Sequence, residues 1–270
     1  MQENKEEIVK QGAIEIEIVR IKGEERKQEA DRVVVEFPLT IFLNDQEFVT
    51  LLCSPSRMDC LAVGFLRAEG LVTGADDLES VKVDEEQGMV FVQTSTKTDL
   101  MEKLYGKRTI TSGCGKGTVF FNVLDSLQSK PVESEVKISA GTLHSLMSDL
   151  QDNSVLYKST GGVHIAAVAD TQKLLFFHED IGRHNAVDKI LGECVLHDLP
   201  IDDKILLSSG RLTSEMVIKG AKLRFPFIVS RSAPTSLSVQ LARELGITLV
   251  GFVRGRRLNI YSHHERISSE

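Results

Sequence analysis

The second half of the chain alternates short apolar runs with segments of helical periodicity, and no other feature restricts its fold as strongly. The clearest helical face is formed by Val187, Ile190, Leu191 and Cys194, which recur at i, i+3, i+4 and i+7. Such alternation predicts an α/β layer with a largely parallel sheet. The runs expected as strands are 164–169, 174–178, 205–208, 227–230 and 248–253. Helical spacing is found at 138–150 and 187–194, and helices are also expected at 214–223 and 237–245.

The first part of the chain has the pattern of a small, mostly antiparallel sheet with one helix packed on it. Strands are expected at 14–18 and 33–37, and hairpins at 39–52, around Asn44 and Asp45, and at 81–93. A helix with one apolar stripe is expected between Ser56 as its N-cap and Gly70 as its C-cap.

A polar stretch that carries Pro131 separates the two patterns and is typical of a linker. The sequence therefore predicts two domains in its 270 residues. The first is an α+β domain over 1–130, which ends in the loop that holds Cys114. The second is an α/β domain over 131–270.

Composition excludes several classes of protein. The net charge of −7 argues against nucleic-acid binding. No run reaches the roughly 18 apolar residues of a membrane helix, so no membrane association is expected. The N-terminal ten residues are charged and lack an apolar core, which favours the cytoplasm over secretion. The four cysteines form no CxxC pair, so no metal site is predicted.

Cys114 lies in the segment Ser-Gly-Cys-Gly-Lys-Gly at 112–117, where glycines make a thiol accessible on a flexible backbone. Lys107, Arg108 and Lys116 are near in sequence, and positive charge lowers a thiol pKa and favours the nucleophilic thiolate. A buried, inert cysteine is the alternative, but no apolar pattern surrounds Cys114. For Cys53, Cys60 and Cys194, the apolar surroundings favour a place in the core.

Polar and charged residues fill the loops at the expected strand ends, where ligands bind in such sheets. Arg254, Arg256 and Arg257 favour an anion site over a solvated turn. The charged segment 179–189 favours a ligand or domain contact over a plain helix start. His164 suits a ligand and a local backbone partner equally, and the segment 232–236 suits a phosphate site and a plain helix cap equally.

These motifs together resemble the formate dehydrogenase accessory sulfurtransferase family (FdhD/NarQ). The segments that carry the resemblance are SGCGK at 112–116, TGGVH at 160–164, EDIGRHNAVDK at 179–189, SSGR at 208–211, SAPTSL at 232–237, GFVRGRRLNIY at 251–261 and AVGFLRAEG at 62–70.

The resemblance implies a sulfur carrier that accepts sulfur from a cysteine desulfurase on Cys114 as a persulfide. The sulfur then goes to the molybdenum cofactor, Mo-bis(molybdopterin guanine dinucleotide), a bound substrate that formate dehydrogenase needs in sulfurated form. It also implies a cytidine-deaminase-like second domain, a homodimer, and no tightly bound protein metal. His184 and Glu179 are expected to shape the pocket. The residues expected to bind the cofactor are Phe252, Val253, Arg254, Gly255, Arg256, Arg257, Gly162, His164, Arg183, His184, Ser209, Arg211 and Ser232.

One departure from the family pattern bears on the mechanism. Many members carry a second cysteine three residues after the first, and here that position is Gly117, so Cys114 must act alone. One alternative is a non-catalytic chaperone for the same cofactor, which would not need Cys114. Another is a zinc-dependent nucleoside deaminase, which the sequence disfavours because Glu179 follows His178 directly and no CxxC exists.

Overall fold

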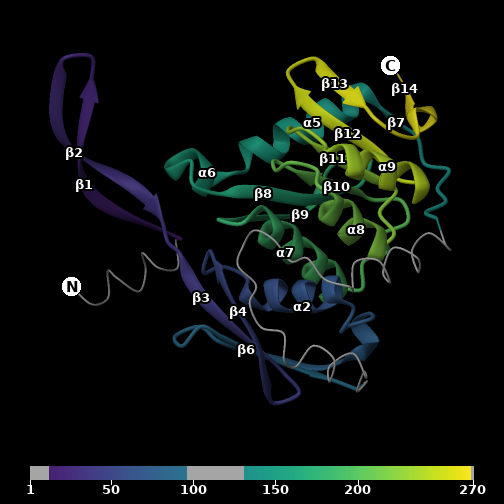
Figure 1. The fold of residues 1–270 in the computed structure, drawn as a ribbon, viewed down its shortest axis with the longest axis horizontal. Helices are drawn as coiled ribbons and strands as arrows, with labels where there is room; N and C mark the ends of the chain where they lie inside the picture. The colour runs from purple at the N-terminus through teal and green to yellow at the C-terminus, as the bar shows by residue number, and fades with distance from the viewer. Residues whose placement is uncertain (1–11, 96–130, 269–270) are drawn as a thin grey trace.

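The computed structural model describes residues 12–95 and 131–268, which form a mixed α and β fold built in layers (Figure 1). Residues 12–95 supply a two-stranded ribbon, a four-stranded sheet and an α-helix. Residues 131–268 supply a six-stranded sheet with helices on both faces. The boundary predicted at residue 130 lies outside the described residues, so the domain division stays a prediction.

The six-stranded sheet has the order β13-β12-β11-β10-β8-β9. Its parallel pairings are β10 with β11 and β11 with β12, and the other three are antiparallel, so the prediction of a largely parallel sheet is wrong. Short connections join β8 to β9 and β12 to β13, and a hairpin connection permits only antiparallel pairing. The strands are β8 (His164–Ala169), β9 (Leu174–Asp180), β10 (Ile205–Ser208), β11 (Phe227–Ser230), β12 (Thr248–Arg254) and β13 (Arg257–Ile260).

Helices bury both faces of this sheet. On β8, Ile165 and Ala167 pack in one apolar cluster with α5, whereas Ala166 and Val168 pack in another with α7, α8 and α9. Apolar residues on both faces are typical of a sheet covered on both sides. The helices of this part are α5 (Ala140–Asp152), α6 (Val155–Thr160), α7 (Arg183–Leu196), α8 (Ser214–Lys222) and α9 (Ser236–Glu244).

The smaller sheet has the order β4-β3-β6-β5 and contains both predicted hairpins. Asn44 and Asp45 take positive φ angles of 48° and 64°, as a two-residue turn between antiparallel strands requires. Its strands are β3 (Phe37–Leu43), β4 (Gln46–Cys53), β5 (Leu78–Asp84) and β6 (Met89–Thr94).

Helix α2 (Met58–Glu69) lies between this small sheet and α7 (Figure 1). Two glycines allow the backbones of α2 and α7 to meet. A Cβ atom on Gly64 would lie 1.7 Å from the Asp188 carbonyl oxygen, and one on Gly192 would lie 1.9 Å from that of Cys60. The crossing of α2 and α7 therefore joins the two parts of the molecule at backbone distance.

Several element ends differ from the sequence prediction. Arg57, not Ser56, is the N-cap of α2, and it takes φ 49° and ψ 51° without a side-chain cap. Gly70 closes the helix at φ 84°, as predicted. Within the segment 232–236, Thr235 caps α9 through a capping box, in which the Ser238 side chain bonds the Thr235 backbone. The run at 33–37 is divided between two strands, because β2 (Glu25–Val34) ends before β3 begins.

The β1–β2 ribbon extends away from these layers (Figure 1). β1 (Ala13–Lys22) pairs antiparallel with β2 over its whole length. The two short strands β7 (Ile138–Ser139) and β14 (Ile267–Ser268) pair near the C-terminus, and single 3-10 turns lie at Ala75–Asp77 (η1) and His264–Arg266 (η2). Within residues 12–95 and 131–268, none of the helices has the length and apolar character that a membrane crossing needs.

Candidate functional site

One edge of the six-stranded sheet gathers most of the predicted site residues. The parallel strands β10 and β11 end side by side, where Ser208 is opposite Ser230. Because β8 runs antiparallel to β10, its first residue, His164, lies at this same edge and pairs with Asp180 at the end of β9. The sheet thus brings together loops that are far apart in the sequence.

Serine side chains and backbone groups hold these loops in place. Ser209 accepts a hydrogen bond from the Ile165 N–H at 2.9 Å, and its Oγ lies 3.4 Å from His164 Nδ1. Ser230 Oγ donates to the Gly210 carbonyl at 2.6 Å and accepts from the Ser232 N–H at 3.0 Å. The predicted residues His164, Ser209 and Ser232 are therefore parts of one ordered network.

Three helices begin at this edge, since α7, α8 and α9 follow β9, β10 and β11 directly. The N-terminus of a helix carries free N–H groups and about half a positive charge. Neither α7 nor α9 has an acidic residue in its first turn, and α8 has one, Glu215. The edge is therefore electropositive from the backbone alone.

Arginines add to this charge, and the Nε atoms of two of them are buried without a hydrogen-bond acceptor. Three buried side-chain atoms of the described residues have no hydrogen-bond partner: Arg183 Nε, Arg231 Nε and Thr213 Oγ1. Arg183 begins α7 and packs against Gly210, and Thr213 is the N-cap of α8. A buried donor without a partner costs about 1–3 kcal/mol. Such donors at an electropositive edge suit an anionic ligand that would accept from them.

Two histidines at the edge are held in their neutral form. Burial lowers the pKa of His184 to about 3, with further effect from Lys219, Arg183 and His164. Burial also lowers the pKa of His164, helped by Arg183 and Arg211. His184 Nε2 lies 3.4 Å from Glu215 Oε2 on α8. Neutral imidazoles can donate or accept a hydrogen bond at a ligand without adding charge.

The predicted segment 252–257 contains the last three residues of β12, the turn at 255–256 and the first residue of β13. Phe252 has φ 55° and its N–H donates to the Ser232 carbonyl at 3.1 Å, while Gly255 has φ 56°. The Arg257 guanidinium lies 5.5 Å from the centre of the Phe252 ring. Arg254, Arg256 and Arg257 are exposed beside the edge, whereas the Val253 side chain is buried in the core. Val253 can therefore face a ligand only through its backbone.

Gly162 and Arg211 complete the predicted set. Gly162 precedes β8 and packs on Val34 of β2. Arg211 is exposed in the loop after β10. Sequence reasoning missed Arg231, although it follows a strand that ends in serine, as Arg211 does. The Arg254 Nε donates to the Arg231 carbonyl at 2.9 Å, which ties the two arginine loops together.

The charged segment 179–189 serves mainly as a contact between the two parts of the molecule. Lys189 and Asp180 are fully buried and lie 2.7 Å apart, and both bond the backbone of Ser54. Asn185 donates to the Leu52 carbonyl at 2.8 Å. Glu179 accepts from the N–H groups of α6, at 3.1 Å from Leu156 and 2.9 Å from Tyr157. Glu179 therefore caps α6, and the first two residues of this segment, 179 and 180, belong to β9 rather than to a loop.

A second polar cluster lies where α2, α7 and β9 meet and was not predicted. Cys60, His178 and Glu193 are buried and their ligand atoms lie within 4.8 Å of one another. Burial would raise the pKa of Glu193, but hydrogen bonds from His178 and Arg57 outweigh it and lower the value to about 2. The core placement predicted for Cys53, Cys60 and Cys194 is confirmed by their burial, but Cys60 has polar partners.

Comparison with known proteins assigns the chain to a family. The model of the FdhD/NarQ family matches residues 34–268. The chain belongs to the FdhD/NarQ family. A Bacillus pumilus protein named sulfur carrier protein FdhD is 46% identical over 238 residues, which cover 88% of this chain and 91% of that protein. A Bacillus subtilis protein of the same name is 45% identical over 91% of this chain and 93% of its own length.

A solved structure supports the FdhD/NarQ assignment. The crystal structure of a protein assigned as a formate dehydrogenase accessory protein from Desulfotalea psychrophila superposes with a TM-score of 0.79 at 28% identity, over 95% of this chain and 99% of that one. The family resemblance of the sequence motifs is thereby confirmed. Cys114 lies outside the described residues. Its role, the cofactor-binding residues and the cytidine-deaminase-like description stay predictions.

Proposed function

We propose that this chain is a sulfur carrier that serves formate dehydrogenase. Cys114 takes sulfur from a cysteine desulfurase as a persulfide and passes it to Mo-bis(molybdopterin guanine dinucleotide), the substrate bound at the sheet edge. The names of the curated relatives support sulfur carriage, and the name of the solved relative supports the link to formate dehydrogenase. The proposal includes a cytoplasmic homodimer, as the family resemblance implies.

The binding part of the proposal rests on one observation. Two arginines at the same edge, Arg183 and Arg231, each have a buried Nε without a hydrogen-bond partner. Each guanine dinucleotide unit contains a pyrophosphate, which accepts hydrogen bonds and prefers guanidinium groups and helix N-termini. Arg254, with Arg256 and Arg257 in the next turn, would hold the outer part of the same ligand. Resident metal chemistry has no part in this arrangement.

The uptake of sulfur by Cys114 needs only thiol–disulfide exchange. The Cys114 thiolate attacks the outer sulfur of the donor's persulfide, the sulfur–sulfur bond of the donor breaks, and the donor cysteine leaves as a thiolate. One sulfur–sulfur bond is broken and one is formed, so this step requires no oxidant. Lys107, Arg108 and Lys116 near Cys114 in sequence favour the thiolate form.

Mass spectrometry tests the proposal. The full-length chain is incubated with a cysteine desulfurase and cysteine, and the peptide that contains Cys114 should gain about 32 daltons, the mass of one sulfur. Cys114→Ala should abolish both the adduct and activation of formate dehydrogenase. Cys194→Ser, a change at a buried thiol, should leave both intact. An unmodified Cys114 peptide, together with full activation by Cys114→Ala, would support the non-catalytic chaperone instead.

A further inference from the structure

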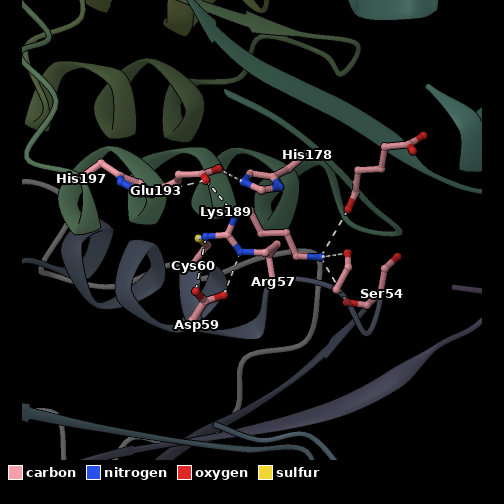
Figure 2. Close-up of polar contacts among 10 residues, drawn as sticks. Ser54, Arg57, Asp59, Cys60, His178, Lys189, Glu193 and His197 are labelled. Atoms are coloured by element: carbon pink, nitrogen blue, oxygen red, sulfur yellow. Dashed lines mark hydrogen bonds and ion pairs between the residues drawn. The ribbon is translucent and has the colours of Figure 1, made fainter. Parts of the chain in front are cut away.

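Three potential metal ligands converge between the two parts of the molecule, away from the sheet edge. Cys60 comes from α2, His178 from β9 and Glu193 from the C-terminal half of α7 (Figure 2). All three are buried, and their sulfur, nitrogen and oxygen atoms lie within 4.8 Å of one another. Ligand atoms around a tetrahedral zinc ion lie about 3.5 Å apart, so side-chain shifts of roughly 1 Å would complete a three-ligand set.

The guanidinium of Arg57 occupies the position that a metal cation would take in this cluster. It donates to Cys60 Sγ at 2.8 Å and to Glu193 Oε1 at 2.8 Å, so it contacts two of the three ligands (Figure 2). His178 Nε2 bonds the other oxygen of Glu193. The positive charge of Arg57 thus compensates Glu193 in the way that a bound metal ion would.

The conformation and exposure of Arg57 suit a side chain that can move out of the cluster. Its φ of 49° is unusual for a residue with a side chain, and strained residues of this kind cluster at functional sites. Its side chain is 40% exposed, whereas the Glu193 side chain is 9% exposed. Asp59, 3.2 Å from Arg57 Nε, offers the guanidinium a second partner nearer solvent.

A surface pocket borders the cluster at Arg57. The pocket has a volume of about 440 Å³ and is lined by Arg57 together with Asp59 and Glu85. Acidic residues at a mouth raise the local concentration of cations. Displacement of Arg57 would open the cluster to this pocket and leave a fourth coordination position for water, as in zinc sites with three protein ligands.

We propose that Cys60, His178 and Glu193 bind a thiophilic divalent ion of the zinc class, and that this ion displaces the Arg57 guanidinium. Thiol, imidazole and carboxylate ligands together select zinc over magnesium or calcium. The thiol proton of Cys60 passes to solvent when the ion binds. The site is separate from the electropositive sheet edge, because Glu193 lies nine residues after His184, or about 14 Å along α7. It does not depend on sulfur transfer.

Cobalt(II) serves as a spectroscopic probe for zinc in the full-length protein. All samples carry Cys114→Ser, so that this thiol adds no signal. Titration should give one cobalt per chain with a sulfur-to-cobalt charge-transfer band, and zinc should displace the cobalt. Cys60→Ser should abolish the band, and His178→Gln should weaken binding at least about tenfold. Cys194→Ser, a matched change on α7 next to Glu193, should retain the band.

Arg57→Gly separates a metal site from a purely structural bridge. Glycine adopts the positive φ freely, so the variant is expected to fold. Removal of the competing guanidinium should tighten cobalt binding by roughly tenfold, which corresponds to about 1.4 kcal/mol. Zinc should also raise the Tm of the parent but not of Cys60→Ser. The proposal is overturned if no thiolate band forms, if Cys60→Ser keeps it, or if Arg57→Gly weakens binding.

Discussion

Arg183 shows at the scale of one residue how binding and stability can be separated. Its Nε is buried without a partner, so the folded protein gains nothing from that donor. We expect Arg183→Met to keep or raise the free energy of unfolding, by up to about 1–3 kcal/mol, because methionine retains the aliphatic packing and removes the buried unpaired donor. The same change should weaken binding of guanosine diphosphate, a fragment of the proposed substrate, by tenfold or more. Isothermal titration calorimetry and urea denaturation measure the two effects.

A charge-matched variant controls this prediction. Arg26 is exposed on the β1–β2 ribbon, so Arg26→Met removes the same charge far from the edge. It should leave both affinity and stability unchanged. Equal weakening by the two variants would show that net charge, rather than the edge, governs binding. A large loss of stability in Arg183→Met would show that Arg183 is structural.

At the scale of elements, the α2–α7 crossing tolerates no side chain at its two glycines. A methyl group on Gly64 would overlap the backbone of Asp188, and backbone cannot rotate away as a side chain can. We expect Gly64→Ala to lower the free energy of unfolding by about 3 kcal/mol or more, through separation of the two helices. Thermal and urea unfolding followed by circular dichroism measure this.

Gly141 provides the matched control, since it also lies in a helix, α5, where an added Cβ would meet only Ser139 Oγ at 3.5 Å. Gly141→Ala should stabilise the protein by about 0.5–1 kcal/mol through helix propensity. The interpretation of the crossing fails if Gly64→Ala is as stable as the parent.

The elements also show what the sequence can predict. Local sequence signals correctly predicted features that depend on local backbone geometry, namely the helix end at Gly70 and the Asn44–Asp45 turn. The N-cap of α2 was missed because Arg57 is held by Glu193, which comes from another part of the chain. Strand direction was wrong because apolar runs specify burial but not pairing. The connections, which are hairpins around 170–173 and 255–256, determine it.

The candidate functional residues also include some that the sequence predicts and some that it cannot predict. The loops after β10 and β11 can be placed from the sequence because the carboxyl ends of neighbouring parallel strands meet at one edge, and these loops hold Ser209 and Ser232. His164 begins its strand and reaches the same edge only because β8 runs antiparallel to β10, which the apolar pattern does not specify. The cluster of Cys60, His178 and Glu193 could not be found, since its members come from three elements without common spacing. A weak signal was present in Glu193 and His197, which are four residues apart on α7.

The whole molecule should lose stability in acid through two groups whose windows of pH overlap. His184 titrates near 6.5 when unfolded, and burial lowers its folded pKa to about 3, so only the unfolded chain takes up this proton between those values. Stability therefore falls as pH drops below 6.5, by up to about 1.4 kcal/mol per pH unit for this group. Glu193, with a folded pKa of about 2 against 4.5, adds a loss between pH 4.5 and 2.

Urea unfolding across this range distinguishes the two contributions. His184→Asn should flatten the profile between pH 6.5 and 4.5, because asparagine binds no proton, and below 4.5 it should leave only the part of the decline that Glu193 contributes. Glu193→Gln should retain the decline between pH 6.5 and 4.5 and should remove the part of the decline below 4.5 that Glu193 contributes. His264→Asn, at a side chain that is 87% exposed, should reproduce the parent profile. A parent whose stability stays constant from pH 6.5 to 4.5 would mean that His184 can become charged inside the fold, and therefore that the edge is more open to water than its packing indicates.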